Sequence, residues 1–147
     1  MSVKIICDSA CDLPEEILEE YDIDLIPIVV IKGDEEYLDG VTILPKKMYD
    51  DMRKGEIYKT AQIPPTVFEK KFEEIAKKGE SAIYIAFSSG LSGTYQTSVI
   101  MRDSLKDKYP NMDIDIVDSK SASVGLGLLV YKASKMAKEG KTKEEIL

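Results

Sequence analysis

Short apolar runs alternate with longer amphipathic segments along this chain, and this alternation constrains the fold more than any other feature. Each apolar run has the length of a buried β-strand. Each amphipathic segment places apolar residues on one side and Lys or Glu on the other, as in residues 66–78. Strands that alternate with helices of this length need crossover connections, so we predict an α/β domain with a mainly parallel sheet sandwiched between helices, in a Rossmann-like three-layer arrangement. The predicted strands are 3–7, 23–31, 82–87 and 113–117, with a hairpin turn at 32–35, and the predicted longer helices are 66–78, 94–109 and 122–139.

The composition excludes several classes of function. With 147 residues the chain is one ordinary domain, and 20 basic against 27 acidic residues give a net charge of -7, which argues against nucleic-acid binding. No apolar run approaches the roughly 20 residues of a membrane span, so we expect at most transient membrane contact. Cys7 and Cys11 are too few and too close for a disulfide framework or a zinc site. We therefore expect a reduced, cytoplasmic protein without a metal site.

The chain contains no histidine. Mechanisms that pair a Ser or Cys nucleophile with a His base are therefore excluded within this chain, as is a His-ligated metal. Any hydrolytic chemistry would need a different base.

The segment 88–94, Ser-Ser-Gly-Leu-Ser-Gly-Thr, follows a predicted strand and opens a predicted helix. Backbone N–H groups and hydroxyls at a helix N-terminus suit an anion such as a carboxylate or a phosphate. The alternative is a tight turn whose serines only cap the helix. The segment lacks the lysine of a P-loop, and Thr94 stands where a nucleophile elbow needs glycine.

Ligands of parallel α/β sheets bind at the carboxyl ends of the strands. Polar turns are predicted at this edge after three strands, and the segment that contains Thr60 can reach it. Ser92, Gly93 and Thr60 would then form an anion site of hydroxyls and a backbone N–H, with no acid–base pair beside them. Such a site binds an anion without an obvious means of reacting with it.

Three aspartates near the same edge offer a competing Mg²⁺ site, although capping and turn formation is the role we favour for them. They are Asp8, Asp12 and Asp118. We interpret a further pattern, Gly-Leu-Gly at 125–127, as close helix packing because it lies inside a helix and lacks the third glycine of a dinucleotide fingerprint.

Four stretches together resemble the DegV family of bacterial fatty-acid-binding proteins, in order and spacing along the whole chain, and DGV at 39–41 also fits. The four stretches are DSACDLP at 8–14, KTAQ at 59–62, SSGLSGTYQ at 88–96 and VDSKSASVGLG at 117–127.

The resemblance implies a binding protein and not an enzyme. Similar proteins bind a long-chain fatty acid, without a cofactor, and present its carboxyl group to a separate ATP-dependent fatty-acid kinase, which forms acyl-phosphate for phospholipid synthesis. The family's carboxylate ligands correspond to Thr60 and Ser92, with Gly93 beside them. Ala61 and Ile63 depart from the family's Thr-Ser-Gln-Pro motif, whereas Thr60 is retained.

Members of the family are nearly twice as long, with a second lobe that closes over the acyl chain and contributes a histidine. The resemblance thus implies that residues 1–147 are the N-terminal lobe of a two-lobe protein, truncated where a capping-box pattern at 142–145 starts the next helix. The rival hypothesis is a phosphoryl-transfer or sugar-phosphate-binding enzyme that uses the Ser/Gly loop, with a metal held by Asp8 and Asp118.

Overall fold

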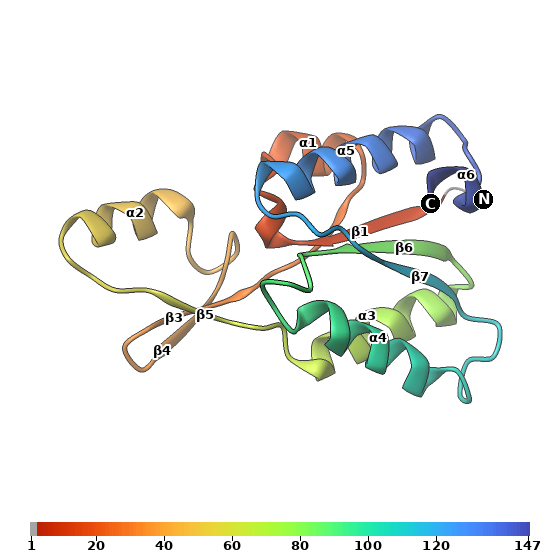
Figure 1. Ribbon diagram of the computed structural model, residues 1–147, viewed down its shortest axis with the longest axis horizontal. Helices are drawn as coiled ribbons and strands as arrows, with labels where there is room; N and C mark the ends of the chain where they lie inside the picture. The colour runs from red at the N-terminus through yellow and green to blue at the C-terminus, as the bar shows by residue number, and fades with distance from the viewer. Residues whose placement is uncertain (1–2) are drawn as a thin grey trace.

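A four-stranded parallel sheet forms the centre of the molecule in the computed structural model, which describes residues 3–147 (Figure 1). Its strand order is β2-β1-β6-β7, and every neighbouring pair is parallel. The predicted parallel sheet between helices is therefore confirmed. The strands are β1 (Lys4–Asp8), β2 (Asp24–Ile26), β6 (Ser81–Ala86) and β7 (Asp113–Asp118).

Helices cover both faces of this sheet. In Figure 1, α1 (Glu15–Glu20) and α5 (Val124–Lys138) lie on one side, and α3 (Pro65–Lys78) and α4 (Thr94–Leu105) on the other. The helices predicted at 94–109 and 122–139 are both shorter in the structure. Within the described residues, no helix combines the length and the apolar character needed to cross a membrane.

A second, antiparallel sheet extends away from the main body together with α2 (Pro45–Arg53) (Figure 1, left). Its order is β4-β3-β5, formed by β3 (Val29–Lys32), β4 (Glu35–Leu38) and β5 (Lys59–Ala61). The hairpin predicted at 32–35 is confirmed, since Lys32 pairs with Glu35.

The prediction of one strand across 23–31 is wrong, because the run is divided between the two sheets. β2 ends at Ile26 and β3 begins at Val29, with Pro27 between them. Proline has no N–H to donate to a ladder. The next N–H, that of Ile28, donates to the Ser9 hydroxyl at 3.0 Å instead of to a strand.

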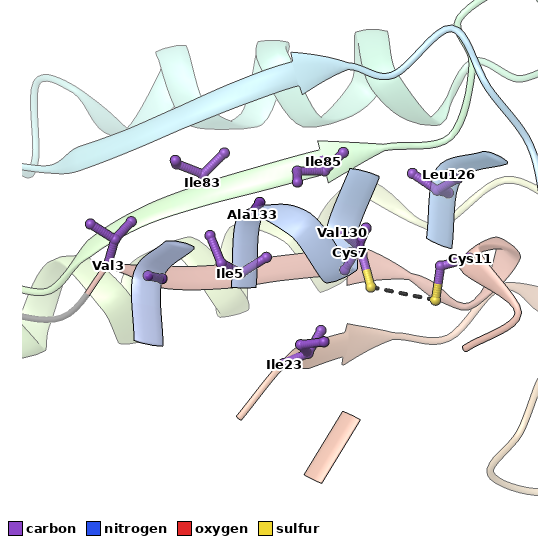
Figure 2. Close-up of a cluster of buried hydrophobic side chains, with 11 residues drawn as sticks. Val3, Ile5, Cys7, Cys11, Ile23, Ile83, Ile85, Leu126, Val130 and Ala133 are labelled. Atoms are coloured by element: carbon purple, nitrogen blue, oxygen red, sulfur yellow. Dashed lines mark hydrogen bonds between the residues drawn. The ribbon is translucent and has the colours of Figure 1, made fainter. Parts of the chain in front are cut away.

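The core has one half on each face of the parallel sheet, because successive strand side chains point in opposite directions. Ile5 and Cys7 of β1 pack in the cluster under α5, whereas Ile6 packs in the cluster that contains Phe68 and Phe72 of α3. Figure 2 shows the first cluster, in which Ile83 and Ile85 of β6 lie beside the β1 side chains. Burial on both faces explains why these strands are nearly continuous apolar runs.

A short last helix, α6 (Lys143–Ile146), begins with the predicted capping box. The Glu145 N–H donates to the Thr142 hydroxyl at 3.3 Å, and the Thr142 N–H donates to the Glu145 carboxylate at 2.9 Å. Lys143 forms ion pairs with Asp113 and Asp115 of β7. These contacts attach α6 to the edge of the parallel sheet.

Close packing at Gly127 confirms the interpretation of the Gly-Leu-Gly pattern. A Cβ atom at this position would lie 2.5 Å from the carbonyl oxygen of Cys11 and 3.2 Å from a methyl group of Leu13. Cys11 ends the short 3-10 turn η1 (Ser9–Cys11), which follows β1 directly. Glycine at 127 thus allows α5 to approach the turn at the carboxyl end of β1.

We predict that Gly127→Ala lowers the free energy of unfolding by about 1–3 kcal/mol, because the added methyl group has no space beside a backbone carbonyl. Gly125→Ala is the matched control in the same helix. Its Cβ would meet Ser121 at an ordinary 3.5 Å, so its effect should stay within about 1 kcal/mol. Urea unfolding followed by circular dichroism measures both, and equal stability of the two variants would contradict the packing argument.

Candidate functional site

The strand order reverses between β1 and β6, and this place of reversal is where parallel α/β sheets bind ligands. β2 lies on one side of β1, and β6 lies on the other. The segments that leave the carboxyl ends of β1 and β6 therefore diverge there. A pocket of about 550 Å³ opens at this point. It is lined by Ala10, Ile28, Val30, Asp39, Met48, Thr60, Ala61, Gln62, Phe87, Leu91, Ser92, Gly93 and Thr94.

Thr60, Ser92 and Gly93, the three residues predicted for the anion site, all line this pocket. Thr60 belongs to β5 of the second sheet, whereas Ser92 and Gly93 belong to the loop between β6 and α4. The fold thus brings together two segments that are far apart in the sequence. Their assignment as carboxylate ligands remains a proposal.

Hydrogen bonds within the loop 88–93 fix its conformation. The carbonyl of Ser88 accepts from the N–H groups of Leu91 and Ser92 at 3.0 and 3.1 Å, and the Ser88 hydroxyl accepts from the Gly90 N–H at 3.2 Å. The Ser92 hydroxyl oxygen accepts from the Thr94 N–H at 3.2 Å and lies 3.0 Å from the Thr94 hydroxyl. The serines therefore cap this turn, and Ser92 also lines the pocket.

The N-terminus of α4 supplies the positive end of a helix at the pocket. Gly93 precedes the first helical residue and, having no side chain, does not cap the helix. The first N–H groups of a helix have no partner inside it and carry a partial positive charge. With the hydroxyls of Thr60 and Ser92, they can hold an anion.

Asp118, at the end of β7, anchors the same loop. Its carboxylate accepts from the Ser89 hydroxyl at 2.5 Å and from the N–H groups of Ser89 and Lys120, both at 3.1 Å. Burial tends to raise the pKa of Asp118, but these hydrogen bonds outweigh it and hold the pKa below its ordinary value. The ionised carboxylate of Asp118 therefore fixes the position of Ser89 through these hydrogen bonds.

Asp8, at the end of β1, connects two walls of the pocket. Its carboxylate accepts from the Phe87 N–H at 2.8 Å, the Tyr84 hydroxyl at 2.9 Å and the Ala10 N–H at 3.2 Å. Ala10 and Phe87 both line the pocket. Burial raises the pKa of Asp8 above its ordinary value, against the opposing effect of these hydrogen bonds.

These contacts give Asp8 and Asp118 the capping and turn roles that we favoured from the sequence. Asp12, the third candidate for a Mg²⁺ site, accepts a hydrogen bond from the Ser123 hydroxyl at 2.6 Å. Across residues 3–147, the structure brings no three His, Cys, Asp or Glu side chains into an arrangement that could hold a metal ion.

Three features of the pocket were missed from the sequence. The Gln62 amide lies against Gly93, where a Cβ atom would collide with its oxygen. Thr94 is buried and positions the Ser92 hydroxyl. Met48 and Ile28 contribute apolar walls. The KTAQ motif contained the signal for Gln62, but the apolar walls depend on where the chain turns after Pro27.

The pocket combines neutral polar groups with apolar walls. The polar groups are the hydroxyls of Thr60, Ser92 and Thr94, the amide of Gln62 and the N-terminus of α4, and the charged residue in its lining is Asp39. An anion bound here would be held by hydrogen bonds from neutral donors instead of by a Lys or Arg. This lining suits a ligand with one small polar end and an apolar body.

The helix α2, which carries Met48, is held by the buried carboxylate of Asp51. Asp51 accepts from Lys47 at 2.5 Å, from the Tyr58 hydroxyl at 2.8 Å and from Lys32 of β3 at 3.3 Å. The hydrogen bonds from Lys47 and Tyr58 hold the pKa of Asp51 well below its ordinary value. This cluster joins α2 to the second sheet and so fixes one wall of the pocket.

Comparison with known proteins identifies relatives along the whole chain. The family model described as "Uncharacterised protein, DegV family" matches residues 2–147. A DegV domain-containing protein of Clostridium perfringens is 43% identical over 144 residues, which are 97% of this chain and 50% of the relative. The chain spans about half the length of the curated relatives that it matches.

Solved structures show the same fold. A stearic acid-binding protein from Eubacterium ventriosum superposes with a TM-score of 0.92 at 28% identity, over 98% of this chain and 50% of that protein. DegV, a fatty acid binding protein from Bacillus subtilis, superposes with a TM-score of 0.87 at 28% identity, over 99% of this chain and 51% of that protein.

We predict that Asp51→Asn lowers the urea midpoint of unfolding at pH 7 and that the loss disappears in acid. Because the folded pKa of Asp51 is depressed, its contribution to stability is present above the unfolded pKa of about 3.9 and fades as the pH falls below it. Urea titrations of both proteins between neutral and acid pH measure the difference. Asp50→Asn is the control, since Asp50 is more exposed and pairs with Arg53. A difference that stays constant over this pH range would contradict the role of the Asp51 charge.

Proposed function

Because this chain belongs to the DegV family, we propose that it binds a long-chain fatty acid and presents the carboxyl group to an ATP-dependent fatty-acid kinase. The kinase would form acyl-phosphate for phospholipid synthesis, and this chain would contribute no catalytic residue and no cofactor. We propose that the protein acts in the cytoplasm.

The observation that carries the proposal is the meeting of Thr60, Ser92 and Gly93 in one pocket with apolar walls. In our proposal, the two hydroxyls and the N-terminus of α4 hold the carboxylate. Ile28, Met48 and Phe87 contact the first part of the acyl tail. The relatives of known structure that are described as fatty-acid-binding proteins support this assignment.

The division of energy between the two ends of the ligand follows from their chemistry. Burial of the tail contributes about 0.8 kcal/mol for each CH₂ group. The hydrogen bonds from the protein replace hydrogen bonds that the carboxylate makes with water. They therefore add less net binding energy than the tail does, and mainly fix the position of the carboxylate. Affinity therefore resides in the tail, and the hydroxyls determine where the carboxyl group is presented. The relatives are about twice as long as the region that this chain matches. We propose that a segment equivalent to their second half covers the rest of the acyl tail.

The chemistry is assigned to a partner because, among the described residues, the pocket lining contains no histidine, lysine or arginine, and its one charged residue is Asp39. The chain contains no histidine, and the Asp8 and Asp118 carboxylates already accept hydrogen bonds from the fold. Hydroxyls and backbone N–H groups can orient a carboxylate but do not supply a phosphoryl group. ATP and the groups that bind it would come from the kinase.

We predict that Ser92→Ala and Thr60→Val each weaken binding of a long-chain fatty acid roughly 10- to 100-fold. This corresponds to the loss of one hydrogen bond to a charged group, about 1.5–3 kcal/mol. Amide proton–nitrogen NMR titration of the chain with palmitate measures it, because this method also detects weak complexes. Signals of residues 60–62 and 92–95 should move first.

The control variant for this titration is Ser104→Ala. Ser104 lies near the other end of α4 and donates its hydroxyl to the Met101 carbonyl, so binding should not change. The control ligands are methyl palmitate, which lacks the charge and should bind more weakly, and glucose 6-phosphate. If the sugar phosphate shifts the signals of the pocket and palmitate does not, the fatty-acid proposal is wrong and the rival anion-binding enzyme is favoured.

We also predict that the purified chain does not consume ATP, with or without palmitate. Addition of an ATP-dependent fatty-acid kinase should give ADP and acyl-phosphate, and Ser92→Ala should reduce that rate. A coupled ADP assay measures both reactions. ATP consumption by the chain alone that is lost in Asp118→Ala would contradict the binding-protein assignment.

A further inference from the structure

The two cysteines form a buried pair beneath the turn that follows β1. Cys7 lies in β1 and Cys11 ends η1, and the two residues are 0% and 1% exposed. Their sulfur atoms are 3.6 Å apart, with the Cys7 thiol donating to the Cys11 sulfur (Figure 2). Both are free thiols. A disulfide requires a separation of about 2.0 Å, so the sulfurs need to approach by about 1.6 Å.

The hydrogen bond makes the two thiols chemically different. Donation from Cys7 lowers the pKa of the Cys11 thiol, and this effect outweighs burial, which acts in the opposite direction. The same hydrogen bond, together with burial, raises the pKa of Cys7. Because the thiolate is the reactive form, Cys11 is the better nucleophile of the pair.

Cys11 also lies at a groove in the surface. It lines an apolar groove of about 340 Å³ between α1 and α5, whose other walls include Leu13, Val124 and Leu128. Val124 and Leu128 are exposed at the surface. A small neutral oxidant in this groove would lie beside Cys11, although Cys11 itself is only 1% exposed, and Cys7 is fully buried and does not line the groove.

We propose that Cys7 and Cys11 are an oxidative modification site at which a hydroperoxide forms a reversible intramolecular disulfide. The Cys11 sulfur attacks one peroxide oxygen, the O–O bond breaks, and the leaving oxygen departs as water after taking up a proton. The Cys7 sulfur then attacks the sulfur of the resulting Cys11 sulfenic acid, and the S–O bond breaks to release a second water. The two thiols lose two electrons and two protons in total, and hydrogen peroxide is reduced to two water molecules.

The residues enclosed by this disulfide hold the walls of the candidate site. Asp8 accepts the N–H of Phe87, Ser9 accepts the N–H of Ile28, and Ala10 lines the pocket directly. The bridge thus constrains the segment from which these contacts are made. The cysteine pair is separate from Thr60, Ser92 and Gly93, the residues proposed to bind the carboxylate, and its oxidation does not require a bound lipid.

The test treats the reduced chain with hydrogen peroxide, blocks remaining thiols with iodoacetamide in denaturant and measures the intact mass. The expected product is a monomer that is lighter by two hydrogen atoms, carries no alkyl group and returns to the starting mass after treatment with dithiothreitol. Peptide mapping should identify the bond between Cys7 and Cys11. The proposal is overturned if both cysteines are alkylated after peroxide treatment, if Cys11 is oxidised only to a sulfinic acid, or if the disulfide joins two chains.

Two variants distinguish the roles of the sulfurs. In Cys7→Ala, peroxide should leave a sulfenic acid on Cys11, which dimedone traps. In Cys11→Ala, Cys7 should react with peroxide at least 10-fold more slowly than Cys11 reacts in Cys7→Ala. Equal rates would contradict the assignment of Cys11 as the attacking sulfur. Because the mass measurement on the unaltered chain needs neither variant, the proposal stays testable if one of them does not fold.

Discussion

The buried carboxylate of Asp8 is the interaction on which the rest of the structure depends. A carboxylate removed from water is costly unless hydrogen bonds replace its solvation, and here the Phe87 N–H, the Tyr84 hydroxyl and the Ala10 N–H do so. These three donors come from the end of β6 and from the turn after β1. Satisfying one buried charge therefore fixes the relative positions of the two central strands at the edge where their connections diverge. The candidate site is built on that junction, since Ala10 and Phe87 are part of its lining.

Two anchors of the same kind complete the pocket. Asp118 holds the loop after β6 through Ser89. Asp51 holds α2 against the second sheet through Lys32 of β3, and it also accepts from Tyr58 and from Lys47 of its own helix. Each anchoring carboxylate lies outside the pocket lining, which leaves neutral hydroxyls, an amide and a helix N-terminus to meet a ligand. The three carboxylates thus hold parts of the protein together, and the polar groups left to contact a ligand are mostly uncharged.

The parallel sheet and its helices could be predicted from the sequence because burial on both faces imposes apolar runs, and amphipathic helices impose a distinct periodicity. Thr60, Ser92 and Gly93 could be placed at one edge for the same reason. The division of residues 23–31 between two sheets could not, because β2 and β3 are both apolar and only Pro27 interrupts them. Ile28 and Met48 were missed because their place in the pocket depends on the path of the second sheet. At the start of that path the Ile28 N–H donates to the Ser9 hydroxyl, a contact between residues 19 positions apart that local propensity does not indicate.

The strand order also has a consequence for how the molecule is assembled. β1 is the first strand of the chain but lies inside the sheet, and on one side it pairs with β6, so that Lys4 lies beside Ala82. Closing so long a loop adds little to the entropy cost, which grows only logarithmically with length, but contacts between distant residues slow folding. During synthesis, β1 is exposed along one edge until residues 81–86 have emerged. The edge of the sheet that carries the pocket therefore forms only after β6 and the loop behind it have emerged, and α5, which covers one half of the core, follows later still.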